Sequence, residues 1–204
     1  SKLPAEFWEG YNGNGEPYGL INLEASRRMG RTFEVEYPDP DVQGFNPCAE
    51  QSLANFETCC LAEIYLPNIE HYEELKKVAR YLYRINKHSL AIKCAVKETE
   101  DIVHKNMRMG IGVTGYLQAT EEQRGLLADC YDYIRAYDKE SSELAGYPTS
   151  IKLTTVKPSG TLSLLAGVTP GAHPGYSEYY IRRIRMSADS SLAHAARKHG
   201  YPVE

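Results

Sequence analysis

Residues 70 to 105 contain neither glycine nor proline, and no other stretch limits the possible folds of this chain as strongly. Apolar residues recur through it at helical spacing, namely Leu75, Val78, Leu82, Ile85, Ile92 and Val96. The spacing predicts one long helix, or two helices with a break near residues 86–89. Because a helix with one apolar stripe buries that stripe against a second layer of structure, we expect a packed globular core.

A second helix is predicted for residues 121–144. Its apolar stripe consists of Leu126, Cys130, Tyr133 and Tyr137. Gly146 followed by Pro148 supplies the signals that commonly end a helix. A glycine-rich connection separates the two helical regions.

The remaining segments alternate in type along the chain. Residues 1–47 are rich in turn-forming residues and predict loops with one short helix or strand. "SIKLTTV" (150–156) predicts a strand that leads through a polar turn into a helix start, and "SEYYIRRIRM" (177–186) predicts another strand. "SSLAHAARKHG" (190–200) predicts a short helix with a serine cap and a glycine stop. Strands alternating with helices indicate an α/β fold, barrel-like or open.

Composition and charge restrict the class of protein. The 204 residues suffice for one core or a piece of a larger domain, and the net charge of −4 gives no reason to expect a nucleic-acid polymer or a membrane as partner. No run approaches the roughly 18 apolar residues that span a bilayer, and the first residues lack the order of a signal peptide, so we expect a cytoplasmic protein. The absence of an initiator methionine suggests a segment of a longer protein.

Three motifs have ordinary structural interpretations that we favour. "GIGVTG" (110–115) matches the dinucleotide-binding pattern, but the residues before it read as a helix end, so a tight helix-to-strand turn is the better interpretation. No histidine lies at metal-ligand spacing from a cysteine, and we predict no metal site. Tyr179 and Tyr180 are expected to serve packing rather than radical transfer.

"NPCAE" (46–50) carries the most reactive side chains of the sequence. In an extended conformation Asn46, Cys48 and Glu50 point to one side. The amide can then bind a polar group, the carboxylate can exchange a proton, and the thiol can react. Because the Glu50 charge would raise the pKa of the thiol, the site suits a thiol that stays protonated and loses a hydrogen atom. A packed cysteine in a turn after Pro47 is the alternative.

"KPSGTLS" (157–163) offers hydroxyl groups and backbone N–H groups at a predicted helix start. Such a terminus can bind an anion. A plain Ser/Thr helix cap accounts for the same residues equally well, and the residues by themselves leave both interpretations open.

Four segments in order resemble the catalytic subunit of ribonucleotide reductases: "NPCAE", "ETCCLAEI", "MRMGIGVTGY" and "KPSGTLSLLAGVTPG". The resemblance covers most of residues 43–187. The eleven-residue step from Cys48 to Cys59 is most similar to class II, adenosylcobalamin-dependent enzymes, in particular the monomeric ribonucleoside-triphosphate reductase type. It implies one part of a ten-stranded α/β barrel with a central finger loop that carries a radical cysteine. Residues 1–204 would then be a segment of a single catalytic barrel domain, comprising a loop-rich first part (1–42), the motif-bearing region (43–187) and a terminal helix (188–204).

The resemblance also implies roles for individual residues in reducing ribonucleotides to 2'-deoxyribonucleotides for DNA precursor synthesis. Cys48 would be the thiyl-radical cysteine, which abstracts the substrate's 3'-hydrogen after adenosylcobalamin generates a 5'-deoxyadenosyl radical. Glu50 would be the general base on the 3'-hydroxyl, Asn46 would hydrogen-bond the ribose, and Cys59 would be half of the redox pair, with Cys60 an ambiguous neighbour. The substrate phosphates would be bound by Pro158, Ser159, Gly160, Thr161, Leu162 and Ser163.

Partners and alternatives follow from the same resemblance. It implies a ribonucleotide substrate, thioredoxin or a similar dithiol as reductant, and a deoxynucleoside-triphosphate effector bound by regions outside this sequence. No cysteine precedes Cys48 to pair with Cys59, so we expect the 204-residue segment alone to be inactive. Tyr179 and Tyr180 follow the 157–163 segment too closely to match the tyrosine pair of class I enzymes. The alternatives are a class I large subunit, which would need an iron or manganese radical partner, and a non-catalytic α/β fragment that binds nucleotides through residues 157–163.

Overall fold

The computed structural model describes residues 3–11, 19–29, 36, 38–175, 177–179, 181 and 183–203. Two compact units are present, Ser1–Pro174 and Gly175–Glu204. The second unit contains one helix, α7 (Ser191–Lys198), among its described residues. Within the described parts of the chain, no helix combines the length and apolar character needed to cross a membrane.

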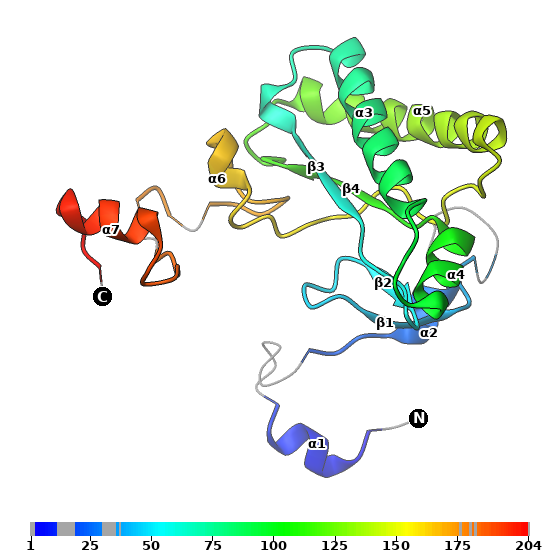
Figure 1. The fold of residues 1–204 in the computed structure, drawn as a ribbon, viewed down its shortest axis with the longest axis horizontal. Helices are drawn as coiled ribbons and strands as arrows, with labels where there is room; N and C mark the ends of the chain where they lie inside the picture. The colour runs from blue at the N-terminus through cyan, green and yellow to red at the C-terminus, as the bar shows by residue number, and fades with distance from the viewer. Residues whose placement is uncertain are drawn as a thin grey trace. The chain divides into compact units, whose positions relative to one another are not determined.

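A small parallel sheet is the centre of the first unit (Figure 1). β3 (Leu61–Tyr65) pairs in parallel with β4 (Gly110–Thr114). A third segment continues the sheet through a parallel bridge between Ile111 and Thr154, supported by a hydrogen bond from the Ile111 N–H to the Leu153 carbonyl at 2.8 Å. Helices connect these segments, so the chain follows a β-α-β-α-β path, the pattern of a parallel α/β sheet.

The long helices confirm most of the sequence predictions. Residues 70–105 form two helices, α3 (Tyr72–Leu90) and α4 (Lys97–Asn106), but the break falls at residues 91–96, after the predicted position. α5 (Glu121–Ala145) begins at a capping box between Thr120 and Gln123. It ends at Gly146, whose φ of 70° is the left-handed conformation that glycine adopts without a steric cost.

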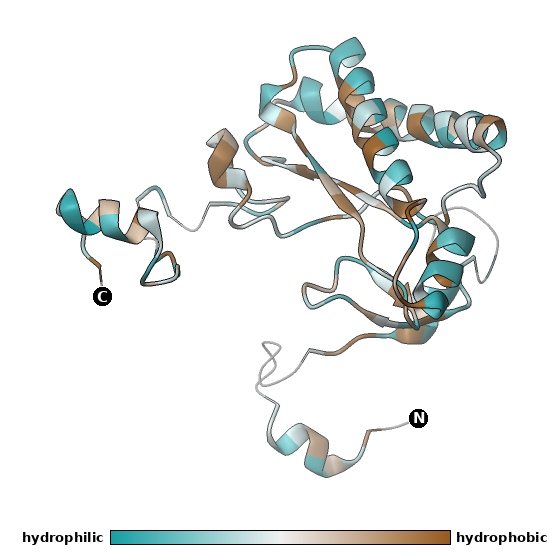
Figure 2. Ribbon diagram, viewed as in Figure 1, coloured by the Kyte–Doolittle hydropathy of each residue, from teal (hydrophilic) through white to brown (hydrophobic). Residues whose placement is uncertain are grey.

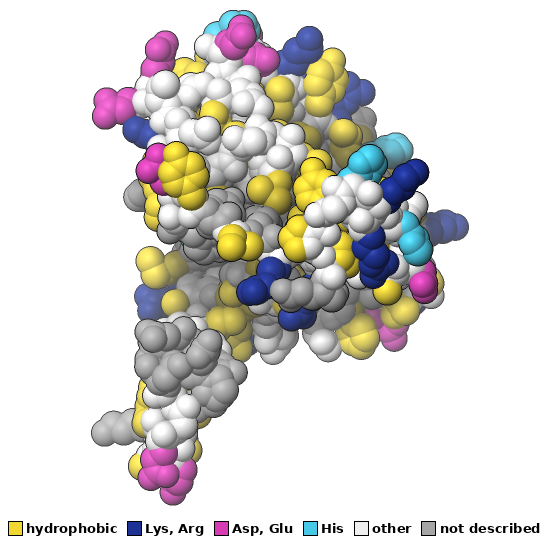
Figure 3. All heavy atoms as spheres, turned by 90° about the vertical axis from the view of Figure 1, so that its left-hand side faces the viewer, with side chains coloured by type: hydrophobic (Ala, Val, Ile, Leu, Met, Phe, Trp, Pro, Cys, Tyr) yellow, Lys and Arg dark blue, Asp and Glu magenta, His cyan; other side chains and the backbone are white. Residues whose placement is uncertain are grey.

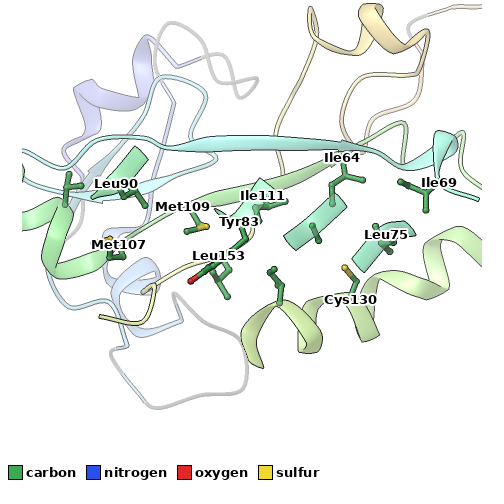
Figure 4. Close-up of a cluster of buried hydrophobic side chains, with 13 residues drawn as sticks. Ile64, Ile69, Leu75, Tyr83, Leu90, Met107, Met109, Ile111, Cys130 and Leu153 are labelled. Atoms are coloured by element: carbon green, nitrogen blue, oxygen red, sulfur yellow. The ribbon is translucent and has the colours of Figure 1, made fainter. Parts of the chain in front are cut away.

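The hydrophobic core lies between the sheet and the two longest helices (Figure 4). Ile64 of β3 and Ile111 of β4 meet Leu75 and Tyr83 of α3 and Cys130 of α5. Burying a large apolar side chain stabilises a fold by about 1.5–3 kcal/mol, so this cluster fixes α3 and α5 on one face of the sheet. Figure 2 shows the corresponding pattern, with hydrophobic turns on α3 and a largely hydrophilic α4.

The interpretation of residues 110–115 as a turn is wrong, because "GIGVT" is the strand β4 itself. Ile111 and Val113 of this strand pack toward the helices, so Gly110 and Gly112 face the other side of the sheet, where only a residue without a side chain fits. A Cβ atom on Gly110 would lie 2.7 Å from Leu61 Cδ2 and from Thr155 Cγ2. Only Gly115, with a φ of 75°, makes the turn that leaves the strand.

The short elements depart furthest from the predictions. Residues 1–47 contain α1 (Ala5–Glu9), α2 (Leu23–Arg28) and β1 (Val42–Phe45), and the unpredicted β2 (Ser52–Ala54) and 3₁₀ turn η1 (Leu66–Asn68) follow. The predicted strand at 150–156 is reduced to the single bridge at Thr154. The strand predicted for 177–186 is absent from the described residues of that range, while Tyr180 and Arg182 lie outside the described residues. The helix predicted for 190–200 is confirmed as α7, with Ser190 as its N-cap.

A buried ion pair joins the two longest helices. Lys87 Nζ of α3 lies 3.0 Å from Asp138 Oδ1 of α5, and both side chains are less than a tenth exposed. Tyr83 Oη also donates to Asp138 at 2.8 Å, and the Ser150 N–H donates to its other oxygen at 2.8 Å. This Lys87–Asp138 network therefore fixes α3, α5 and the start of the third sheet segment to one another.

The molecular surface is mixed in character, with charged side chains scattered among hydrophobic ones on the face shown in Figure 3.

Candidate active site

Cys48 lies at the tip of a β-hairpin. β1 and β2 pair antiparallel, and the Asn46 N–H donates to the Gln51 carbonyl at 3.1 Å at the base of the connecting loop. Within the loop, the Ala49 N–H donates to the Asn46 carbonyl at 2.9 Å, which closes a β-turn with Pro47 as its second residue. The Cys48 side chain is exposed at this tip.

The predicted extended arrangement of residues 46–50 is therefore wrong. Pro47 has the fixed φ that favours a turn at its position, and Ala49 adopts a left-handed φ of 59°. Strand alternation consequently does not decide which side chains meet. The packing of the hairpin against the sheet decides it instead.

Asn46 connects the hairpin to the second cysteine of the candidate site. Its Oδ1 accepts a hydrogen bond from the Gln51 N–H at 3.0 Å, and its Nδ2 donates to Cys59 Sγ at 3.5 Å. Cys59 lies just before β3, so this contact joins the loop to the sheet. The structure thus brings together Asn46 and Cys59, two of the residues selected from the sequence.

Glu50 is held at its backbone, while part of its side chain has no partner. Thr155 Oγ1 donates to the Glu50 carbonyl oxygen. The carboxylate atom Oε2 is buried and makes no hydrogen bond to any residue that the structure describes. Because buried polar atoms are nearly always hydrogen-bonded, this oxygen is available to a ligand or a proton.

The environment of Cys59 keeps its thiol protonated. Partial burial raises the pKa of Cys59 above its ordinary value of 9.0, and the negative charge of Glu50 raises it further. The hydrogen bond from Asn46 and the charge of Lys157 oppose these effects without cancelling them. Cys60, which is half-buried, also has a raised pKa, chiefly because of burial. All five cysteines are free thiols.

We predict that Glu50→Gln lowers the pKa of Cys59, because it removes a nearby negative charge. The pH at which Cys59 reacts with iodoacetamide at half its maximal rate should lie above 9.0 in the wild type and should move to lower pH in the variant. Mass spectrometry that resolves alkylation by residue would measure it. Glu70→Gln, which removes an exposed charge just before α3, is the matched control and should leave that pH unchanged. Equal midpoints in Glu50→Gln and wild type would contradict the electrostatic link between Glu50 and Cys59.

Glu63 and Lys157 extend the site on the face of the sheet opposite α3 and α5. Residues of β3 alternate between faces. Ile64 points into the core, so Glu63 points to the other side. Its carboxylate, 1% exposed, accepts a hydrogen bond from Ser159 Oγ and lies 3.4 Å from Lys157 Nζ. Burial raises the pKa of Glu63, and Lys157 partly offsets this effect. The Lys157 stem lies over β4, because a Cβ on Gly112 would be 3.2 Å from its Cγ.

Sequence reasoning missed Glu63 and Lys157 as members of the site. The available signal was Glu63, an acidic residue inside the short apolar run "LAEIY". In a strand it lies on the same side as Cys59, four residues earlier. An acid in such a run must find a buried partner. Lys157 precedes the predicted anion-binding residues, and the sequence indicates no partner for it.

Residues 158–163 form a polar turn followed by a single helical turn. α6 (Ser163–Ala166) has four residues, and its N-cap, Leu162, makes no side-chain capping bond. The interpretation of this segment as a plain Ser/Thr helix cap is therefore wrong, since the Ser159 hydroxyl bonds to Glu63. Ser159 itself has a left-handed φ of 52°. The tie to Glu63 holds this turn against β3, on the same face as Cys59.

In these features a cysteine-bearing hairpin meets the face of a parallel α/β sheet opposite α3 and α5. A family model described as "Ribonucleotide reductase, barrel domain" matches residues 15–125, more than half of the chain. The chain belongs to this family.

Individual relatives agree with the family match. An adenosylcobalamin-dependent ribonucleoside-triphosphate reductase of Euglena gracilis is 40% identical over 198 residues, covering 94% of this chain and 27% of the relative. The enzyme of the same name from Lactobacillus helveticus is 36% identical over 230 residues, covering 96% of this chain and 31% of the relative. A crystal structure of a B12-dependent (class II) ribonucleotide reductase superposes with a TM-score of 0.67 at 30% identity, covering 80% of this chain and 27% of that one. The chain thus spans about a quarter to a third of the relatives it matches.

Proposed function

We propose that this chain is the radical-cysteine segment of an adenosylcobalamin-dependent ribonucleoside-triphosphate reductase, which converts ribonucleotides to 2'-deoxyribonucleotides. The observation that carries the proposal is the meeting of the NPCAE hairpin with Cys59, through the Asn46–Cys59 contact. Relatives with this activity in their names support it, as does the superposition on a class II enzyme. The same matches favour class II over a class I large subunit, the alternative from the sequence.

The proposal assigns each polar group of the hairpin a task at the ribose. The exposed Cys48 thiol, as a thiyl radical, takes the hydrogen atom from C3' and returns it at the end of the reaction. The partnerless Oε2 of Glu50 accepts the proton of the 3'-hydroxyl. Asn46, fixed by Gln51 and Cys59, offers its remaining amide hydrogen to a ribose hydroxyl. We further propose that this hairpin is the finger loop at the centre of a ten-stranded barrel.

Adenosylcobalamin, when bound, would supply the 5'-deoxyadenosyl radical that removes the hydrogen atom from Cys48. The exposure of Cys48 at the tip of a turn fits this requirement, because a radical acceptor must be reachable. Among the described residues, the proposal gives only Cys48 a role toward the cofactor.

Cys59 and a second thiol supply the reducing electrons in this proposal. The 2'-hydroxyl leaves as water, the two thiols deliver two electrons and two protons, and a disulfide forms. A protonated Cys59 suits this task, since the reaction consumes its proton. Thioredoxin or a similar dithiol then reduces the disulfide by exchange. A deoxynucleoside triphosphate bound outside this segment is the proposed effector.

The 158–163 turn is the proposed phosphate-binding segment for the nucleotide, comprising Pro158, Ser159, Gly160, Thr161, Leu162 and Ser163. The support is its position on the face that carries Cys59, held there by the Ser159–Glu63 bond. Lys157, adjacent in sequence, adds a positive charge on that face. A helix of four residues contributes little through its dipole, so loop N–H groups and hydroxyls would make these contacts.

The proposed function predicts that the complete protein forms deoxynucleotide from a ribonucleoside triphosphate when given adenosylcobalamin and a dithiol. Product that forms without adenosylcobalamin but requires an iron or manganese radical subunit would assign the chain to class I. A complete protein that binds the nucleotide and yields no product would support the non-catalytic alternative.

Cys59→Ser is predicted to leave the first radical step intact and to stop repeated turnover. The variant keeps the shape of the side chain and the neighbouring Asn46 donor, so cleavage of the cofactor's cobalt–carbon bond should proceed at close to the wild-type rate. Multiple turnovers driven by a dithiol should fall at least about 10³-fold, because the disulfide cannot form. Cys60→Ser is the matched control and should turn over normally. If Cys60→Ser is the inactive variant and Cys59→Ser is not, the redox role belongs to Cys60.

A further inference from the structure

Charged side chains are buried at the base of the hairpin that carries Cys48. Arg108 precedes β4, and its side chain is 1% exposed, as are those of Asp39 and Glu57. Lys152, on the third sheet segment, lies 3.4 Å from Asp39 Oδ2. We call Arg108, Asp39, Glu57 and Lys152 the hairpin clamp. Two cations face two carboxylates, so the clamp is balanced in charge.

Arg108 contacts both ends of the hairpin with one planar group. Its Nη1 and Nη2 bond the two oxygens of Asp39 at 2.6 and 2.8 Å, a bidentate pair. Its Nε lies 2.9 Å from Glu57 Oε1. Asp39 comes just before β1 and Glu57 just after β2, so the guanidinium holds the entering and leaving strands together.

Further bonds attach the clamp to the strands themselves. Glu57 Oε2 accepts a hydrogen bond from the Ala54 N–H of β2 at 2.7 Å, and Lys152 donates to Ser52 Oγ of the same strand. Asn106, at the end of α4, donates to Glu57 Oε1 at 2.9 Å. Although burial by itself raises the pKa of Asp39, the hydrogen bond and charge of Arg108 hold it below the ordinary value of 3.8. Both partners of the bidentate pair are therefore charged at neutral pH.

The hairpin needs such an anchor because it is small. β1 has four residues and β2 has three, with an irregular register between Val42 and Gly44. An isolated two-stranded hairpin is at best marginally stable in water. Contacts at its base therefore help to fix its direction over the sheet, together with the Asn46–Cys59 and Thr155–Glu50 bonds near the tip. A small tilt at the base displaces Cys48.

We propose that Arg108 is a positioning residue that aims the Cys48 hairpin at Cys59 and the ribose. The proposal rests on the function proposed above, in which Asn46, Cys48 and Glu50 act together from this hairpin. A displacement of about 1 Å in a catalytic group can cost 100-fold in rate, so the clamp contributes to catalysis although none of its residues contacts substrate.

The test uses Arg108→Gln in the complete protein, with Lys87→Met as the matched control. Both variants break a buried ion pair. The Lys87–Asp138 network joins α3, α5 and the start of the third sheet segment, and its hydrogen bonds to Tyr83 and Ser150 do not involve the hairpin. Arg108→Gln should lower kcat at least about tenfold at a temperature where circular dichroism shows both variants folded. It should also speed alkylation of Cys59 at fixed pH at least about fivefold, since the Glu50 charge that raises its pKa moves away.

The control should change neither kcat nor the alkylation rate of Cys59. Arg108→Lys keeps the charge but loses the bidentate bond, so its kcat and its Cys59 alkylation rate should lie between those of the wild type and Arg108→Gln. If Arg108→Gln does not fold, Arg108→Lys takes its place in the comparison. Alkylation needs no reductase activity, so it tests the clamp even if the proposed function is wrong. Alkylation rates in the Arg108 variants equal to that of Lys87→Met would overturn the proposal, and accelerated alkylation with no reductase activity in wild type would overturn only the proposed function.

Discussion

Cys48→Ala is expected to abolish deoxynucleotide formation by the complete protein while leaving it folded. The thiol is exposed at the tip of a turn, so its removal creates no cavity and leaves the Ala49–Asn46 hydrogen bond in place. The chemistry, in contrast, loses the only atom proposed to exchange hydrogen with C3'. The rate of product formation should therefore fall at least about 10³-fold. Product assays and thermal unfolding of the same preparation would measure both effects.

Rapid-freeze EPR with adenosylcobalamin and a ribonucleotide adds a readout that does not depend on turnover. A radical signal involving the Cys48 sulfur should appear in the wild type and be lost in Cys48→Ala. Cys94→Ala is the matched control, because Cys94 lies in the connection between α3 and α4, where its sulfur donates a local hydrogen bond to the Ile92 carbonyl at 3.8 Å. The control should retain both signal and turnover. A signal that survives Cys48→Ala would remove this residue from the radical role.

Lys87→Met is expected to cause a large loss of stability, although Lys87 lies outside the candidate site. It leaves the Asp138 carboxylate charged and buried, with only neutral donors such as Tyr83 and Ser150. Breaking a buried ion pair by removing one partner typically costs 3–5 kcal/mol, and we expect a loss of about that size in the free energy of unfolding. Urea-induced unfolding of the complete protein, followed by circular dichroism, would measure it.

Two further variants make this prediction specific. Lys97→Met removes a largely exposed ion pair with Asp101 on α4 and should change stability by less than about 1 kcal/mol. The double variant Lys87→Met/Asp138→Asn should recover part of the lost stability, because it removes the unpaired buried charge and keeps an amide oxygen that can accept from Tyr83 or Ser150. A single-variant loss below about 1 kcal/mol, or no recovery in the double variant, would show that the Lys87–Asp138 network is not the link between the helices.

The helices could be predicted from the sequence because their signals are local. Thr120, Gln123 and Gly146 lie within a few residues of the ends they define, and apolar spacing locates the stripe between them. The break between α3 and α4 lies after the predicted residues 86–89, because that segment contains no helix-breaking residue. Asn86 and Lys87 are buried there and belong to the helix. The strand β4 was missed because its glycines are selected for space beside Leu61 and Thr155, a reason that lies in neighbouring strands.

The sequence by itself determined the reactive groups of this protein: a thiol, an amide and a carboxylate in one short segment, a second thiol eleven residues on, and the order of motifs that its family shares. Only the tertiary structure decided how they meet. It folded "NPCAE" into a turn, placed Asn46 against Cys59, and added Glu63, Lys157 and Arg108. The reason is the range of the contacts. Arg108 and Asp39 are 69 residues apart, and Ser159 and Glu63 are 96 apart, so such partners are chosen by strand pairing and by the need to neutralise buried charge, which no local pattern encodes.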